Sequence, residues 1–349
     1  MNPLSLPEPE AAAIAASNEL ADVVRAAIDA EGGWIDFEQY MQIVLYEPGL
    51  GYYSAGATKL GEAGDFTTAP ERSEIFGGAL ARFLARAMAP LERHAVLELG
   101  AGSGALAEQL LRSLPVAGRG GVDYAILEPS AELKARQRER LAGFGDRVRW
   151  IESLPQRGFD GIVVANEVAD AIPVARFVKH ADGVVPLGIA ADGNRFVIET
   201  GPESERLTRA VDAIEAALDA PLPVGYRSEV CLQLAPWIEA IAAAIGRGGL
   251  LLIDYGMTRR DYYRHERTDG TLICHYRHRA HDDPLLWPGL QDLSAWVDFS
   301  AAAAAAEHAG LDVSGYTTQA QFLVESLAGD AALAERVRSP ADASALNAL

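Results

Sequence analysis

Short apolar runs alternate with amphipathic stretches through the middle of the chain. The runs that we predict to be strands are Ala95–Leu99, Tyr124–Leu127, Val148–Ile151, Gly161–Ala165 and Gly249–Asp254. Helical periodicity follows the first two runs, at Ala105–Ser113 and Ala131–Leu141. Strands that alternate with helices are typical of a mainly parallel sheet covered by helices on both faces. The pattern therefore predicts a doubly wound, Rossmann-like α/β fold.

The first 94 residues do not follow this alternation. Amphipathic patterns predict a helix over Ala11–Ala30, ended by Gly32-Gly33, and a second helix over Ile75–Met88. Residues 34–75 between them are rich in aromatic and turn-forming residues, which favours an irregular surface loop or a lid. We expect residues 1–94 to form an N-terminal helical and lid-like extension.

A long stretch separates the fourth and fifth predicted strands. It contains three β-prone runs and then two helical stretches, in order Arg176–His180, Val184–Ile189, Arg195–Glu199, Ser204–Leu218 and Leu232–Ile245. The β-prone runs are joined by Asp-Gly dipeptides, which are typical of tight hairpin turns. We therefore predict an inserted β-meander closed by helices. The expected divisions are the α/β core over 95–175 and 248–330, the insertion over 176–247, and a loose tail over 331–349.

Charge and composition narrow the possible partners. The 349 residues carry a formal net charge of -19, which disfavours binding to nucleic acid or to an anionic membrane because polyanions are repelled. Two cysteines, Cys231 and Cys274, exclude a disulfide framework and a cysteine-rich zinc site. The sequence shows neither a signal-peptide pattern nor a charge-free apolar stretch of about 20 residues. We therefore expect a cytoplasmic protein without membrane insertion, and no nucleic-acid partner.

A glycine-rich turn follows the first core strand. Gly100, Gly102 and Gly104 lie between the strand and a helix, where glycine lets the backbone turn tightly and lets a ligand approach. Gly100, Gly102 and Ala105 also satisfy the dinucleotide-binding fingerprint. Glu98 favours a different ligand, because a carboxylate there repels a pyrophosphate but attracts the sulfonium and ammonium of S-adenosylmethionine. The alternative for Glu98 is a charge that points into solvent.

Two further polar positions follow the next strands. Glu128 ends the second strand, where α/β nucleotide folds place an acid that binds both ribose hydroxyls. Its distance from Gly100 exceeds the usual spacing of about 20 residues, and a loop insertion at Pro115–Asp123 accounts for the difference. Glu152 and Ser153 follow the third strand, where the adenine edge can be read. Plain surface positions remain the alternative for these acids.

Asn166, Glu167 and Asp170 follow the fourth strand, at the edge where reacting groups collect in open α/β sheets. A methyl acceptor must meet the cofactor there, so we predict Asn166 as a cofactor and catalytic residue and the two acids as catalytic. If the acceptor is a guanidinium, two carboxylates can clamp its fork and accept the proton that it loses on alkylation. The alternative for Asp170 is a helix cap before Ala171.

The fifth strand and the polar segment beyond it complete the predicted site. Asp254 and Tyr255 end the strand at the same edge, and we predict that they bind substrate together with His275. The polar segment holds His275, Arg277, His278, His281 and Asp282. Its spacing gives no helical ligand pair and arginines compete with the histidines, so we predict a substrate-side loop and no metal site.

These motifs together resemble the MidA family of class I S-adenosylmethionine-dependent methyltransferases over roughly residues 35 to 325. The resemblance rests on five segments, Glu47–Tyr53, Gly64–Pro70, Leu97–Gly104, Asn166–Pro173 and Leu252–Gly256. Eukaryotic members are mitochondrial arginine methyltransferases needed for assembly of respiratory complex I. The resemblance therefore implies S-adenosylmethionine as cofactor and an arginine on a protein as acceptor, either in a complex I subunit or in another arginine-containing protein.

The resemblance also implies that Gly64–Thr68 helps to enclose the cofactor, which adds Asp65, Thr67 and Thr68 to the expected cofactor site. One segment departs from the family pattern, because Trp296 stands where a histidine is expected. If that position touches substrate, the acceptor differs from that of the family.

The leading hypothesis is an S-adenosylmethionine-dependent protein arginine methyltransferase. A non-catalytic assembly factor that binds S-adenosylmethionine without turnover is the first alternative, because a fold does not determine function. A nicotinamide-dependent oxidoreductase is the second, and it would bind NAD and tolerate loss of the charge at Glu98.

Overall fold

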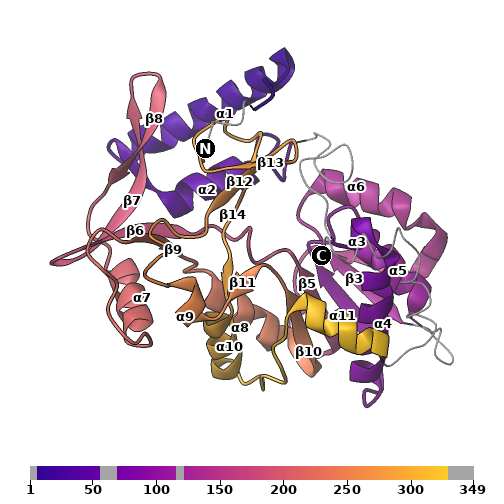
Figure 1. The fold of residues 1–349 in the computed structure, drawn as a ribbon. Coiled ribbons are helices and arrows are strands. Elements are labelled where there is room, and N and C mark those ends of the chain that lie inside the picture. Colours follow the sequence, from indigo (N-terminus) through magenta and orange to yellow (C-terminus); the bar gives the residue numbers. More distant parts are fainter. Residues whose placement is uncertain (1–5, 56–68, 115–121, 329–349) are drawn as a thin grey trace.

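A five-stranded parallel sheet lies at the centre of the computed structural model, which describes residues 6–55, 69–114 and 122–328 (Figure 1). In spatial order the strands are β10 (Ile245–Ile253), β5 (Phe159–Asn166), β2 (Ala95–Leu99), β3 (Asp123–Leu127) and β4 (Val148–Ile151). The five predicted strands and their parallel arrangement are confirmed, although β10 begins four residues earlier than expected.

Apolar side chains on both faces of the sheet explain why helices cover it on both sides. Val96, Ile162 and Val164 pack against α4 (Glu74–Met88) and α5 (Ala105–Ser113). Leu97, Val163 and Ala165 face the other way, in a cluster that includes Ile241 of α8 (Leu234–Ala244). Strands buried on both faces are typical of parallel sheets. The predicted doubly wound fold is therefore confirmed.

The remaining helices around this sheet extend the two layers. They are α3 (Ala69–Arg72), α6 (Ala131–Arg140), the 3-10 helix at Ala142–Arg147, α10 (Phe299–His308) and α11 (Gln319–Ala328). Helix α10 packs on α8, and α11 packs on α4. The alanine-rich run Ala301–Ala306 lies inside α10, as its helix propensity predicts.

A second sheet, which is antiparallel, lies beside the core. Its strands are β1 (Trp34–Asp36), β7 (Gly183–Asp192), β6 (Ala175–His180), β9 (Arg227–Val230) and β8 (Arg195–Thr200). The predicted meander is confirmed as β6, β7 and β8. Strands β1 and β9 were not predicted, because each is only three or four residues long and pairs with a distant segment.

Helices α1 (Ala11–Ala30) and α2 (Phe37–Tyr46) cover this second sheet. Helix α1 has the predicted bounds, but the prediction that residues 34–75 are irregular was wrong over α2. The carboxylate of Asp36 caps α2 by accepting the N–H of Gln39 at 2.7 Å. The side chains that α2 buries recur at helical spacing, at Phe37, Tyr40, Met41, Val44 and Leu45.

The chain crosses between the two sheets after β10. Short strands β11 (Gly256–Met257) and β15 (Val297–Asp298) pair beside the core, while β12 (Ile273–Tyr276), β13 (Arg279–His281) and β14 (Asp292–Ser294) form a small sheet against α2. Helices α7 (Glu205–Glu215) and α9 (Arg259–Tyr262) complete this part. We call α1, α2 with the turn that follows it through Tyr53, the antiparallel sheet and β12–β14 the second lobe. No helix among the described residues is long and apolar enough to cross a membrane.

Candidate functional site

The strand register brings the predicted site residues to one edge of the central sheet. Leu99 lies opposite both Leu127 and Ala165, and Ile253 lies opposite Asn166. Gly100 and the polar residues Glu128, Glu152, Asn166 and Asp254 therefore follow or end the five strands at the same edge of the sheet. The strand order reverses at β2, because β3 and β4 are added on one side of it and β5 and β10 on the other, and ligands of open α/β sheets bind at such a switch point.

The glycine turn takes a conformation that few other residues adopt. Gly100, Gly102 and Gly104 have φ angles of 60°, 54° and 80°, in the left-handed region that favours glycine. A Cβ atom on Gly100 would also lie 3.1 Å from Cγ2 of Val168, which follows β5. The turn thus brings the ends of β2 and β5 together, as a cofactor site at the switch point requires.

Glu98 lies inside the structure, and the alternative that it points into solvent was wrong. Its side chain is 2% exposed, and one carboxylate oxygen accepts the hydroxyl of Tyr124 at 2.7 Å. Burial raises the pKa of Glu98 to about 7, and the charge of Glu128 adds to the rise. A buried carboxylate that ionises near neutral pH gains by binding a cation. The predicted cofactor contact of Glu98 stays a prediction.

Glu128 is also buried, at the end of β3. It accepts the N–H of Ser130 at 3.0 Å and the side-chain amide of Gln137 at 2.9 Å. Burial raises the pKa of Glu128, and these hydrogen bonds oppose the rise. Glu152 and Ser153 are exposed beyond β4, and Glu152 accepts Nζ of Lys134 at 2.9 Å. Their roles toward ribose and adenine stay predictions.

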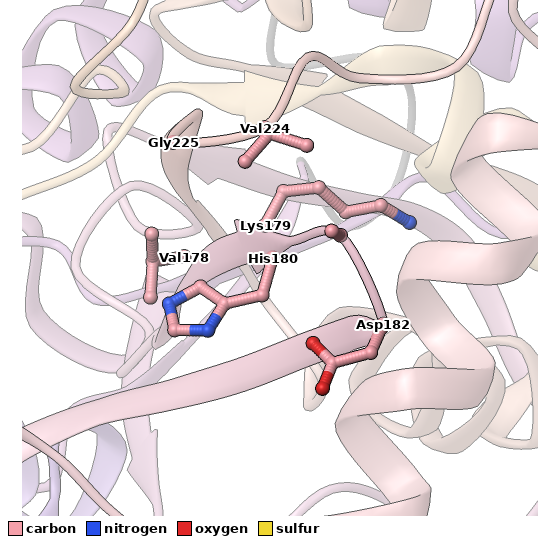
Figure 2. A pocket seen from close by; sticks show the side chains of 7 residues that line it. Val178, Lys179, His180, Asp182, Val224 and Gly225 are labelled. Atoms are coloured by element: carbon pink, nitrogen blue, oxygen red, sulfur yellow. The ribbon is translucent and has the colours of Figure 1, made fainter.

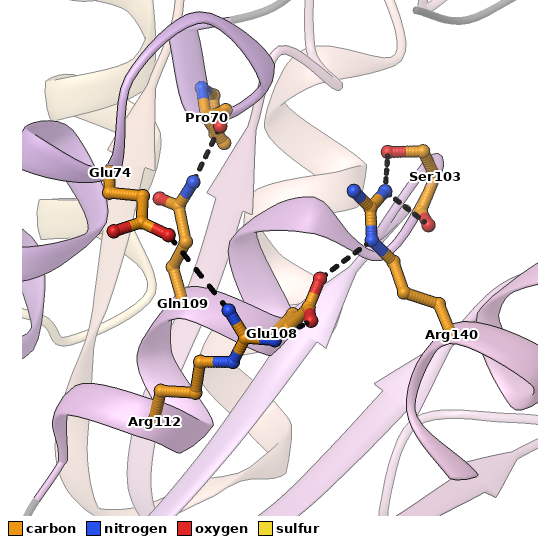
Figure 3. A network of polar contacts seen from close by, with 7 residues as sticks. All are labelled: Pro70, Glu74, Ser103, Glu108, Gln109, Arg112 and Arg140. Carbon is orange, nitrogen blue, oxygen red and sulfur yellow. Dashed lines mark hydrogen bonds and ion pairs between the residues drawn. The ribbon is translucent and has the colours of Figure 1, made fainter. Parts of the chain in front are cut away.

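A polar network fixes the outer side of the glycine turn (Figure 3). Arg140 donates to the backbone oxygen of Ser103 at 3.2 Å, to its hydroxyl at 3.0 Å, and to Glu108 at 2.8 Å. Gln109 of α5 donates to the carbonyl of Pro70 at 2.5 Å. The start of α3 is thereby held against α5, directly after the segment Gly64–Thr68. The predicted cofactor residues of that segment, Asp65, Thr67 and Thr68, lie outside the described residues.

The loop after β5 is held by a carboxylate from β10. One oxygen of Asp254 accepts the N–H groups of Val168, Ala169 and Asp170 at 2.9 to 3.2 Å, and the other accepts that of Tyr255 at 2.8 Å. Burial raises the pKa of Asp254 to about 6. The structure thus gives Asp254 a positioning role, and its contact with substrate stays a prediction.

Asn166 and Glu167 occupy unusual positions at the end of β5. The side-chain oxygen of Asn166 is buried and has no hydrogen-bond partner among the described residues. Glu167 has a φ angle of 52°, which is uncommon for a residue other than glycine, and its N–H donates to Ile253 at 2.8 Å. Unsatisfied buried acceptors and strained backbone collect at ligand sites. Both observations fit the predicted site.

Carboxylates from both lobes act electrostatically on Asp170. Burial raises the pKa of Asp170 well above its ordinary value, and Asp254, Asp292 and Glu167 raise it further. Asp292 belongs to β14 of the second lobe, and it accepts the hydroxyl of Tyr53 at 2.8 Å. Buried carboxyl groups that act on one another in this way favour a cationic ligand.

Two tyrosines line the same region. Tyr46 and Tyr53 stack with ring centroids 5.6 Å apart, and the hydroxyl of Tyr46 donates to the carbonyl of Ala171 at 2.8 Å. Burial raises the pKa of Tyr46, and the charges of Asp292 and Asp170 add to the rise. The tyrosines therefore connect the second lobe to the loop after β5.

The other predicted substrate residues lie around this cluster. Tyr255 is 58% exposed at the end of β10. His275 pairs directly with Asp292 across β12 and β14, which places both side chains on one face of the small sheet. Trp296 packs with the cluster around Tyr262 and lies under Arg267, 5.3 Å from its guanidinium carbon. The substitution of the expected histidine thus falls on a position that packs against side chains of β6, α7 and α9.

A surface hollow on the antiparallel sheet is separate from this site. It has a volume of about 570 Å³ and is lined by the β6–β7 turn, where Lys179, His180 and Asp182 surround it (Figure 2). Lys179 is paired with Glu215 at 2.7 Å. None of the residues predicted to bind cofactor or substrate lines this hollow.

Four residues of the site were missed by sequence reasoning, namely Tyr46, Tyr53, Gln137 and Asp292. Tyr46 precedes the segment Glu47–Tyr53 and Tyr53 ends it, and the aromatic and glycine content of that segment was the signal available. Gln137 and Asp292 carry no local signal, because their contacts come from segments far away in the sequence.

The residues present fit S-adenosylmethionine. The left-handed glycines leave room beside the backbone, the unpaired oxygen of Asn166 can accept a hydrogen bond from a ligand, and the buried acids favour a cationic ligand with hydroxyl donors. A family model described as "Putative S-adenosyl-L-methionine-dependent methyltransferase" matches residues 79–317. The chain belongs to this family, the MidA methyltransferases. The predicted cofactor is thereby confirmed, and the oxidoreductase alternative is not supported.

Relatives and solved structures agree with this family membership. A Danio rerio protein named "Protein arginine methyltransferase NDUFAF7, mitochondrial" is 32% identical, and the match covers 77% of this chain and 67% of that protein. The Drosophila melanogaster homologue is 31% identical over 95% of this chain and 80% of its own length. A Burkholderia thailandensis structure bound to S-adenosyl-homocysteine is 42% identical with a TM-score of 0.89, covering 98% of this chain and 90% of that one.

Proposed function

We propose that this methyltransferase acts on the guanidinium group of arginine in a protein substrate. The observation that carries the proposal is the set of carboxylates around Asp170, to which both lobes contribute. A guanidinium has a planar fork of five donors, which matches carboxylates better than any other side chain does. The names of the Danio rerio and Drosophila melanogaster relatives support the same acceptor.

In this proposal Glu167 and Asp170 bind the guanidinium and accept its proton. S-adenosylmethionine, when bound, supplies the methyl group. The acceptor nitrogen forms one bond to carbon and loses one proton, because both the arginine and its methylated product carry a single positive charge. Asp170 is suited to take this proton, since burial and neighbouring acids make its carboxylate more basic than usual. Asp254 keeps the loop that bears Asp170 in place.

Methyl transfer to arginine is tested with S-adenosylmethionine that carries a labelled methyl group and with arginine-containing proteins, followed by hydrolysis and amino-acid analysis. We expect methylarginine as the labelled product. Glu167→Gln and Asp170→Asn should each lower the rate by at least about 100-fold, the usual contribution of a general base, without loss of S-adenosyl-homocysteine binding. Asp192→Asn, at an exposed position on β7, is the matched control.

Two outcomes would contradict the proposal. Label on a residue other than arginine would assign a different acceptor. The second outcome is a protein that binds the cofactor tightly but transfers no methyl group to any protein tested, even when enzyme and acceptor are at equal concentration. This outcome would favour the non-catalytic assembly factor.

A further inference from the structure

Gln137 is a fully buried polar residue in a helix that otherwise faces solvent. Helix α6 has the sequence AELKARQRER, and Gln137 is its one buried residue. Burial of an amide without hydrogen bonds costs free energy, so a glutamine at this position requires partners for its donors and its acceptor.

The side chain finds those partners on three separate elements. Its Nε2 group donates to the carboxylate of Glu128 at 2.9 Å and to the carbonyl of Gly102 at 2.9 Å. Its Oε1 atom accepts the indole N–H of Trp150 at 2.9 Å. One amide thus joins the glycine turn after β2, the acid after β3, and strand β4. Both N–H donors are used, so the group has a single orientation.

Two neighbours of Gln137 on the same face of α6 bind residues that follow β4 and β2. Lys134 and Arg140 lie three residues before and after Gln137, a spacing that puts the three side chains in one row. Lys134 pairs with Glu152 beyond β4, and Arg140 binds Ser103 in the glycine turn (Figure 3). Gln137 is the central and most buried member of this row.

We infer that Gln137 is a positioning residue for the cofactor, which holds the Glu128 carboxylate in the orientation that binds ribose and holds the glycine turn against it. The inference rests on S-adenosylmethionine as cofactor and on the proposed ribose role of Glu128, and it does not depend on arginine as acceptor. Each carboxylate oxygen has two lone pairs, so Glu128 can accept from Gln137 and from a ribose hydroxyl together.

An amide is the group that this position requires. Glutamate has the same shape but offers no donor when ionised, and it places a second negative charge beside Glu128. Methionine fills a similar volume and makes none of the three hydrogen bonds. These two substitutions therefore separate the polar role of Gln137 from its packing.

The test measures S-adenosyl-homocysteine binding to the full chain by titration calorimetry at pH 5.5 and pH 8, with each variant compared with the parent at the same pH. Gln137→Met should weaken binding at least about tenfold, as expected for lost hydrogen bonds to a carboxylate. Gln137→Glu should weaken binding more at pH 8 and recover at pH 5.5, where its protonated carboxyl can donate to Glu128. Gln42→Glu adds the same charge on the exposed side of α2, and its affinity should equal that of the parent at both pH values.

A purely structural role predicts a different result. The inference would be overturned if the variants melt at a lower temperature but keep the parental affinity. It would also be overturned if Gln137→Glu loses the same affinity at pH 5.5 and at pH 8. If Gln137→Glu does not fold, Gln137→Met is measured with the 2′-deoxy analogue of the ligand. Its affinity loss should then be smaller, because the analogue lacks a hydroxyl that Glu128 binds, and an equal loss with both ligands would overturn the inference.

Discussion

At the scale of single residues, burial gives ordinary acids unusual chemistry. Glu98, Glu128, Asp170 and Asp254 all have pKa values raised mainly by burial. The residue types and their places after strands could be read from the sequence, and so the candidate acids were predictable. The burial of these acids could not be predicted from one strand alone, because it depends on side chains of other strands, such as Tyr124.

Glu98 gives a prediction whose sign follows from its raised pKa. The folded protein holds this proton up to about pH 7, whereas an exposed glutamate loses it near 4.5. Between these values the folded state binds more protons than the unfolded state, so this group's contribution to stability falls as pH rises. Glu98→Gln removes the effect and should stabilise the cofactor-free protein at pH 8 by on the order of 2 kcal/mol.

Urea unfolding of Glu98→Gln and of the parent at pH 5 and pH 8 checks this expectation. The stability difference should be small at pH 5, just above the ordinary pKa of glutamate, and should reach its full size at pH 8. At pH 8 the variant should also bind S-adenosylmethionine more weakly, because the ionised carboxylate that attracts the cation is gone. If the stability difference between the variant and the parent is the same at pH 5 and pH 8, Glu98 does not titrate near pH 7. If the affinity for S-adenosylmethionine is also unchanged, Glu98 does not contact the cofactor.

At the scale of secondary-structure elements, long periodic segments were predictable and short ones were not. Helix α1 spans enough residues to show its period, and the five core strands follow from short apolar runs that alternate with helical stretches. Helix α2 was hidden in a segment whose aromatic and turn-forming residues favour a loop. Strands β1 and β9 exist only through pairing with β7 and β6, a long-range contact that no local pattern contains.

The cap of α2 provides a test at this scale. Asp36→Ala removes the acceptor for the N–H of Gln39, and helix caps contribute about 1 kcal/mol. We expect Asp36→Ala to lower the free energy of unfolding by about that amount, whereas Asp36→Asn keeps a side-chain oxygen and should lose only a few tenths. Urea denaturation followed by circular dichroism measures both. Equal losses in the two variants would show that the cap oxygen does not stabilise α2.

At the scale of the whole molecule, the site belongs to both lobes. The central sheet supplies the cofactor edge, and the second lobe supplies Tyr46, Tyr53 and Asp292. The placement of the candidate cofactor residues at one edge was predictable, because they follow strands of a recognisable parallel sheet. The other half was not, since Asp292 reaches Asp170 only through the packing of β14 on α2 and the return of the chain to the core. A division of this kind suggests that the two lobes bind different ligands.

Asp292 tests that division of labour. If the core binds the cofactor and the second lobe binds the acceptor, Asp292→Asn should raise the apparent KM for an arginine substrate about 10- to 100-fold, as expected for a lost hydrogen bond between charged groups. The affinity for S-adenosyl-homocysteine should stay at the parental value, because the glycine turn, Glu98 and Glu128 are untouched. Tyr53→Phe removes the hydroxyl that orients Asp292 and should cause a smaller rise in the same KM.

Steady-state methyl transfer and titration calorimetry separate the two effects, and Asp282→Asn, an exposed acid near the same small sheet, controls for the loss of one charge. A KM that does not change in Asp292→Asn would mean that the guanidinium is held by Glu167 and Asp170 alone. A fall in cofactor affinity as large as the rise in KM would mean that Asp292 acts on the cofactor side, and that the second lobe closes the cofactor site rather than selecting the acceptor.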